Sequence, residues 1–232
     1  MNLRLSAGID REPWQARLHI PNYRIKDAAK FADISPQTIA NWQRLGGSGF
    51  LPRKPDRAAL SYLQLIELAV VASFRKGGVK LHKIKAAREW LQKQIESEYP
   101  FAQHRFKTDG KELLMEYRQI EPNADDGHLV VASNHGQLGW SDILNRLKEF
   151  EYDKASKIVS QWHVDGMNSP VVIDPKVSFG APTVRGIPTW AVRDRWKAGS
   201  DLKEIADDYE LSRSNVIAAL RFEEVSWERQ AA

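Results

Sequence analysis

The chain has 232 residues, of which 42% are apolar and 9% aromatic, and this is enough to build one large domain or a few small ones. It contains no cysteine, which excludes disulfide bonds, thiolate nucleophiles and cysteine metal sites. It has neither a long unbroken apolar run nor an apolar centre near the N-terminus. We therefore expect a cytoplasmic protein without a membrane span or a secretory signal.

The charge of the chain is distributed unevenly. The formal net charge is +4, but the residues up to Pro100 contain 17 Lys and Arg against 9 Asp and Glu, whereas the remainder contains 17 against 21. The two parts therefore carry net charges of +8 and −4. A basic N-terminal part favours a polyanionic partner and the acidic remainder favours a different one, although ordinary solvated charge explains the pattern equally well.

Two short helices joined by a tight turn are expected after the first twenty residues. Apolar residues recur at helical spacing in residues 25–32, and Ser35 followed by Pro36 is a start signal for a second helix that runs to the Gly46-Gly47 pair. In this second helix Ile39 points inward, which leaves four polar side chains largely outward: Gln37, Thr38, Asn41 and Arg44. This arrangement is a helix-turn-helix.

Two longer helices complete an N-terminal unit that we place at residues 20–100. A Gly- and Pro-rich loop or small wing comes first. Apolar residues in 65–72 then predict a well-buried helix that stops at the Gly77-Gly78 pair, and an apolar stripe from Ile84 to Ile95 predicts another that Pro100 ends. We expect a homodimer, with the apolar face of Leu60 to Phe74 and the unit that follows as candidate interfaces.

The polar face of the second short helix suits contact with duplex DNA. Amide side chains such as Gln37 and Asn41 pair with adenine and Arg44 pairs with guanine, and each good pair discriminates by about 1–3 kcal/mol. Trp42 is expected to support packing. The alternative is a solvated surface helix. The full set of candidate DNA contacts is Ser35, Gln37, Thr38, Asn41, Arg44, Arg53, Lys54 and Arg57, with Lys83 and Arg88 as further phosphate contacts.

A β-rich middle unit is expected at residues 101–168. The Asp109-Gly110 pair is a hairpin signal, the stretch "HLVVASNHGQLGW" contains a short strand, and "EFEYDKASKIVSQWHV" contains two strands around a polar turn. A short helix near residues 142–147 precedes that pair of strands.

A C-terminal unit of three short helices is expected at residues 169–228. An extended stretch with many Pro and Gly residues runs to Pro188, and helices then fit residues 189–197, 202–209 and 213–222. Ser200 or Asp201 is expected to cap the second helix and Ser212 the third. The last two helices resemble a second helix-turn-helix, which could also bind DNA, but its acidic neighbours argue against this.

No residue pattern predicts an enzyme. The six His residues are scattered without metal-ligand spacing, and the adjacent acidic pairs cannot converge on one substrate as a catalytic dyad must. No phosphate-binding glycine loop is present. We therefore expect neither catalysis nor a cofactor or metal.

Two families resemble parts of the chain. Residues 23–95, "YRIKDAAKFADISPQTIANWQR" and "LSYLQLIELAVVASFRKGGVKLHKIKAAREWL", resemble the DNA-binding domain of MerR-type regulators, which has a helix-turn-helix, a wing and a helix pair with a Gly-containing link. The long dimerising coiled coil of those regulators and their effector site do not follow here, so an effector-sensing role is not implied.

Residues 173–224 look like the small domain of unknown function found in many VapB-type antitoxins. The matching features are Asp174-Pro175, Gly180 with Pro182, Gly186-Ile187-Pro188, Ala198-Gly199 and the pattern from Tyr209 to Ala219. Such antitoxins pair with a VapC-like PIN-domain ribonuclease.

Together, the patterns and resemblances predict a mainly α protein with a winged, MerR-like helix-turn-helix head, a β-rich middle and a three-helix C-terminal unit. The resemblance implies an antitoxin that represses its own promoter and neutralises a PIN-type ribonuclease. A MerR-like transcription regulator without a toxin partner and an interaction adaptor are the alternatives. Three cations after Pro100 are candidate toxin contacts: Arg185, Arg193 and Arg229.

Overall fold

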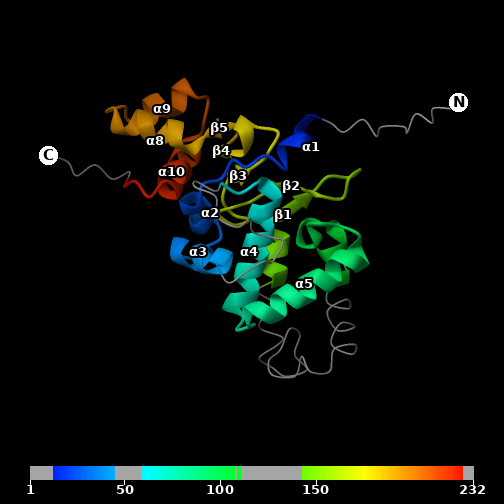
Figure 1. Cartoon of the computed structure of the whole chain (residues 1–232). Coiled ribbons are helices and arrows are strands. Elements are labelled where there is room, and N and C mark those ends of the chain that lie inside the picture. Colours follow the sequence, from blue (N-terminus) through cyan, green and yellow to red (C-terminus); the bar gives the residue numbers. More distant parts are fainter. Residues whose placement is uncertain (1–12, 45–58, 108, 111–142, 227–232) are drawn as a thin grey trace, which may run out of the picture.

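The computed structural model describes residues 13–44, 59–107, 109–110 and 143–226, and the fold is mainly helical with one five-stranded antiparallel sheet (Figure 1). The helices are α1 (Pro13–Arg17), α2 (Ile25–Phe31), α3 (Pro36–Arg44), α4 (Tyr62–Lys76), α5 (Leu81–Ile95), α8 (Thr189–Lys197), α9 (Leu202–Asp208) and α10 (Arg213–Phe222). Two short 3-10 helices are η1 (Pro100–Ala102) and η3 (Ser178–Gly180). The strands are β1 (Phe150–Tyr152), β2 (Val159–Trp162), β3 (Val171–Ile173), β4 (Pro182–Val184) and β5 (Ile187–Pro188).

The expected pair of short helices is present as α2 and α3. Asp33 between them has a φ of 53°, and the Ile34 amide donates to the Ala29 carbonyl at 3.0 Å, which closes the end of α2. The Ser35 hydroxyl accepts the Thr38 amide at 3.1 Å and so caps α3, as the Ser-Pro signal predicted. Ile39 is fully buried and Trp42 is also buried, so both act as packing residues.

Helix α4 lies at the centre of the chain and is buried along most of its length (Figure 1). Ser61 and Gln64 form a reciprocal capping box at its start, and Leu60 before it pairs with Tyr23 through backbone hydrogen bonds. The expectation that the face of Leu60 to Phe74 forms a dimer interface is therefore wrong. Those apolar residues already pack against other parts of the same chain and offer no surface to a second copy.

The middle of the chain contains one of the predicted hairpins and lacks another. β1 pairs with β2 in antiparallel fashion, and residues 143–148 are helical, as the sequence predicted. The hairpin turn predicted at Asp109-Gly110 is wrong, because residues 104–107 and 109–110 are helical and a Cβ on Gly110 would lie 2.9 Å from the buried Phe106 ring. The strand predicted in "HLVVASNHGQLGW" lies outside the described residues.

The five strands form one meander in the order β1-β2-β3-β4-β5. Trp162 on β2 pairs with Ile173 on β3, so the sheet continues across the boundary that the sequence suggested between residues 168 and 169. β4 and β5 are joined by Arg185 and Gly186, which have φ angles of 49° and 86° and form a tight two-residue turn.

The three C-terminal helices begin and end close to the predicted positions. Asp201 accepts the amides of Lys203 and Glu204 and caps α9 in a capping box, and Ser212 accepts the Asn215 amide at 3.2 Å and caps α10. Helices α8, α9 and α10 pack on one another and lie at one end of the molecule, with α5 toward the other (Figure 1).

The first helices of the chain contact its last elements directly. The Phe31 ring of α2 stacks on the Phe222 ring of α10 with centroids 6.0 Å apart, and Lys30 donates to the Phe222 carbonyl at 2.5 Å. Asn22 donates to the Phe179 carbonyl at 2.5 Å. Residues that are far apart in sequence are thereby joined, so α2 and α10 lie side by side (Figure 1).

Candidate nucleic-acid interface and partner surface

The outer face of α3 presents two amide side chains one helical turn apart. Gln37 is exposed and Asn41 half-buried, and Gln37 Nε2 donates to Asn41 Oδ1 at 3.0 Å. This hydrogen bond holds the two amides together on one face of α3. Amide pairs in such an arrangement suit the edges of adenine.

Two of the other α3 candidates have a structural role. The hydroxyls of Ser35 and Thr38 lie 2.8 Å apart, and the Ser35 hydroxyl also accepts the Thr38 amide. These bonds stabilise the first turn of α3. Arg44 is the last residue of α3, but its side chain and the whole of Arg53, Lys54 and Arg57 lie outside the described residues.

The expectation that Lys83 and Arg88 contact phosphates is wrong, because both side chains are buried. Arg88 is 2% exposed, and its Nε donates to Glu67 Oε2 at 2.6 Å while its Nη2 donates to the Glu98 carbonyl at 2.6 Å. Glu67 Oε1 also accepts the Phe101 amide at 2.7 Å. Burial raises the pKa of Glu67 despite the Arg88 guanidinium beside it.

A cation at the end of α4, which the sequence reasoning missed, lies beside the turn between α2 and α3. Lys76 forms an ion pair with Asp33, and its hydrogen bond lowers the pKa of that carboxyl. Arg75, Lys76 and Lys80 are exposed around this end of α4. The sequence shows two adjacent cations, Arg75 and Lys76, before the Gly77-Gly78 pair, but only the fold shows that they lie next to the turn between α2 and α3.

The candidate toxin contacts differ in their surroundings. Arg185 lies exposed in the turn between β4 and β5. Arg193 on α8 is held inside the C-terminal unit, where it donates to Asp194 and, at 2.8 Å, to Glu223. These carboxylates raise the pKa of Arg193, and its guanidinium is engaged within the chain. Arg229 lies outside the described residues.

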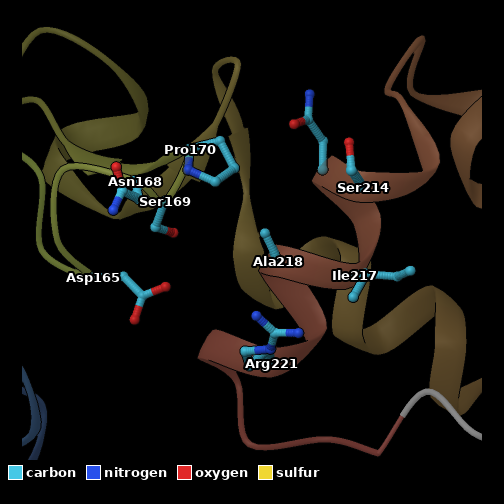
Figure 2. Close-up of a pocket in the computed structure, with 9 residues that line it drawn as sticks. Asp165, Asn168, Ser169, Pro170, Ser214, Ile217, Ala218 and Arg221 are labelled. Carbon is cyan, nitrogen blue, oxygen red and sulfur yellow. The ribbon is translucent and has the colours of Figure 1, made fainter.

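An open groove of about 870 Å³ separates α10 from the loop before β3 (Figure 2). Ser214, Ala218 and Arg221 line it from α10, and Asp165 and Asn168 face them from the loop (Figure 2). The lining mixes polar and apolar groups and carries one charge of each sign, Asp165 and Arg221, so it does not have the basic character of a phosphate-binding surface.

The described part of the chain contains no cluster of three or more His, Asp and Glu side chains that could hold a metal ion. Within the same residues, no helix has the length and apolar character needed to cross a membrane.

Comparisons with known proteins show similarity to a family model, a curated protein and a solved structure. The family model described as "Protein of unknown function (DUF433)" matches residues 171–222, which run from β3 to the end of α10. A curated protein of Mycobacterium tuberculosis strain ATCC 25618 / H37Rv, named "Putative antitoxin VapB45", is 23% identical over 230 residues, covering 89% of this chain and 95% of that protein. The crystal structure of Rv2018 from Mycobacterium tuberculosis aligns with a TM-score of 0.73 at 22% identity and covers 88% of this chain and 99% of that one.

Together, the first two matches support an antitoxin-like family for this chain. The third match concerns the fold alone, and it extends over the helical head, the sheet and the C-terminal helices together. The expected relationship to antitoxins is thus supported in its general form, since the relative carries an antitoxin's name. The MerR-like winged head, DNA binding and the PIN-domain partner stay predictions.

Proposed function

We propose that this protein is a DNA-binding antitoxin that represses its own promoter and neutralises a PIN-domain ribonuclease. The antitoxin part rests on the relative named as an antitoxin, which matches the chain over almost its whole length. The DNA-binding part rests on one structural observation, the hydrogen-bonded Gln37–Asn41 pair on the outer face of α3. Under this proposal the protein acts in the cytoplasm, where it would meet both its promoter DNA and the ribonuclease. Neither role requires catalysis by this chain.

The architecture around α3 supports its insertion into the major groove. Ile39 and Trp42 fix the inner face of α3 against the core, so that the outer face is presented as a rigid unit. The turn that precedes α3 is tied to α4 through the ion pair of Asp33 and Lys76. One such helix contacts few bases, so we further propose that a homodimer reads two half-sites.

Changing either amide of α3 is expected to reduce sequence-specific binding to the DNA upstream of the gene. Gln37→Ala and Asn41→Ala should each cost about 1–3 kcal/mol, or roughly 5- to 150-fold in affinity, because each removes one base-reading side chain. Fluorescence anisotropy with promoter DNA and an unrelated duplex measures both affinity and preference. Gln94→Ala, at an exposed position of α5, is the matched control and should bind like the parent. Parental affinity and preference in both α3 variants would show that α3 is not the reader.

Neutralisation of the toxin is expected to survive the loss of DNA binding. Co-expression of the full chain with its proposed partner, a PIN-type nuclease, should restore growth, and the Gln37→Ala/Asn41→Ala double variant should restore growth equally well while no longer repressing the promoter. An inhibitor can cover the carboxylates that hold Mg²⁺ in the nuclease, or place a cation such as Arg185 near them. Persisting toxicity in the presence of the full chain would contradict the antitoxin role and would favour a transcription regulator without a toxin.

A further inference from the structure

An open hollow lined by lysines lies where the β1–β2 hairpin meets two helical segments of the middle of the chain. Its volume is about 430 Å³. Lys107 lines it from helical residues 104–107, Lys148 lines it from helical residues 143–148, and the turn between β1 and β2 contributes Lys154 and Lys157. The hairpin and α3 lie on opposite sides of α4 (Figure 1), so this lysine hollow is separate from the outer face of α3.

Backbone contacts between distant segments fix the shape of the lysine hollow. The His104 amide donates to the Lys157 carbonyl at 2.8 Å, and Gln103 forms an antiparallel bridge with Ile158. Within the turn, the Lys157 amide donates to the Asp153 carbonyl at 3.0 Å. Lys157 has a φ of 59°, which lies in the left-handed region that a lysine rarely adopts. The hydrogen bonds on both sides of this residue therefore hold it beside the hollow.

The ring of Tyr152 positions one of the lysines. The ring lines the hollow and meets the edge of the His104 ring, with centroids 5.1 Å apart. The Lys107 ammonium lies over the Tyr152 ring at 5.2 Å. A contact with an aromatic face orients the ammonium but leaves its positive charge in place.

The two carboxylates that line the hollow are engaged by neighbouring groups. Asp153 Oδ1 accepts the Ser156 amide and the Ser156 hydroxyl, each at 2.8 Å, and the Ala155 amide at 3.2 Å. The hydrogen bond from the Ser156 amide is the main cause that lowers the pKa of Asp153. Glu151 Oε1 lies 2.7 Å from His163 Nε2.

The hollow therefore keeps an excess of positive charge. Four lysines against two carboxylates give its lining a formal charge of +2. Among the residues that the structure describes, none of these four lysines forms an ion pair. Cations gathered around one hollow repel one another and concentrate anions from solution.

The chemistry and the size of the hollow indicate the class of its ligand. A lysine ammonium donates hydrogen bonds and accepts none, so the four lysines suit an anion with many acceptor oxygens. Small-molecule sites usually enclose about 300–1,000 Å³, and the volume of 430 Å³ lies within that range. An oligophosphate concentrates several negative charges in such a space. An acidic peptide spreads the same charge over several residues, and a DNA duplex presents its phosphates along a helix.

We propose that the lysine hollow binds an oligophosphate through its four ammonium groups. Inorganic triphosphate and the phosphate chain of a nucleoside triphosphate share this chemistry. The site does not rest on the proposed function, because its ligand is neither the promoter nor the ribonuclease.

Calorimetric titration of the full chain with inorganic triphosphate tests the site, at low ionic strength and without divalent cations. Lys148→Gln and Lys154→Gln should each weaken binding by roughly tenfold, because each removes one charge-assisted contact. The matched controls Lys197→Gln and Lys203→Gln, which remove exposed lysines from α8 and α9, should bind like the parent. Absence of binding by the parent, or equal losses in both pairs of variants, would overturn the proposal.

A second titration identifies the source of the phosphate chain. Adenosine triphosphate that binds more tightly than inorganic triphosphate would indicate a nucleotide, and the opposite order would indicate the free anion. Either order supports the site. The Gln37→Ala/Asn41→Ala variant should bind triphosphate like the parent, which separates this site from the proposed DNA-reading face.

Two polyanions of other classes provide the opposing outcomes. Tetraglutamate should bind much more weakly than triphosphate, and equal binding would assign the hollow to an acidic peptide instead. An unrelated DNA duplex should bind the Lys148→Gln/Lys154→Gln variant nearly as well as it binds the parent. If this variant loses duplex binding as strongly as it loses triphosphate binding, the lysines belong to a nucleic-acid surface and the proposal is wrong.

Thermal unfolding separates a binding role of the lysines from a structural one. Saturating triphosphate should raise the melting temperature of the parent but not that of the Lys148→Gln/Lys154→Gln variant, with sodium chloride of equal ionic strength as the control. Without ligand, the variant should melt at or above the parental temperature, because the repulsion between the ammonium groups is reduced. A variant that melts well below the parent would show that these lysines stabilise the fold, and it would contradict the proposal.

Discussion

Replacement of Arg88 by Met is expected to destabilise the folded chain by about 3–5 kcal/mol. The guanidinium joins α5 to Glu67 on α4 and also reaches the Glu98 carbonyl, and the Glu67 side chain is completely buried. Methionine fills a similar volume but leaves the carboxylate without its counter-charge. Urea unfolding measures the loss, and Lys93→Met, at an exposed position of α5, provides the control.

The destabilisation by Arg88→Met is expected to depend on pH. Burial already raises the pKa of Glu67 above its ordinary value of 4.5, and removal of Arg88 takes away a cause that lowers it. A carboxyl with a raised folded-state pKa favours folding below its unfolded pKa, and this stability is lost as the pH rises through the folded pKa. The loss in Arg88→Met should therefore be smaller near pH 4.5 than at pH 7. A Glu67→Leu/Arg88→Met double variant should recover much of the stability, and an equally unstable double variant would argue against the unpaired charge as the cause.

Replacement of Trp162 by Ala is expected to cost about 3–5 kcal/mol and to destabilise the whole chain together. Trp162 is fully buried on β2, packs edge-on against Phe150 with ring centroids 5.6 Å apart, and donates from Nε1 to Glu149 at 3.1 Å. It also pairs with Ile173, which begins the connection to the C-terminal helices.

The shape of the unfolding curve tests whether the sheet unites the middle and C-terminal parts. Calorimetry of Trp162→Ala should give one transition at a lower temperature, and Trp190→Ala, at a half-exposed position of α8, should leave the transition near that of the parent. Two separate transitions, with the C-terminal helices melting at the parental temperature, would show that the units are independent.

Local signals predicted the helices well because they act within a few residues. The Ser35-Pro36 start, the Asp201 capping box and the Ser212 cap each depend on side chains that bond to backbone amides two or three positions away. The Asp109-Gly110 signal failed because packing against Phe106 prevails over the turn preference of that dipeptide.

Features that depend on distant contacts could not be predicted in the same way. From the basic charge of the N-terminal part, Arg88 was predicted to contact a phosphate. Only the position of Glu67 on the neighbouring helix explains why Arg88 is instead buried. The amide pair of α3 was found because Gln37 and Asn41 are one turn apart. A small pocket of about 120 Å³, lined by Arg17, Tyr62 and Phe179 among others, had no sequence signal, since its walls come from opposite ends of the chain.

The contacts between the two ends of the chain constrain the order of folding during synthesis. Asn22 and Tyr23 find their partners 157 residues later, and Lys30 finds its partner 192 residues later. At a translation rate of about 5–20 residues per second, a ribosome needs about 8–30 s to synthesise the 157 residues that separate Asn22 from its partner. The N-terminal helices of a nascent chain therefore lack these contacts until the last helices have been synthesised. A chain released before residue 180 lacks all three of these contacts, so the closed arrangement of its two ends is a property of the full-length protein alone.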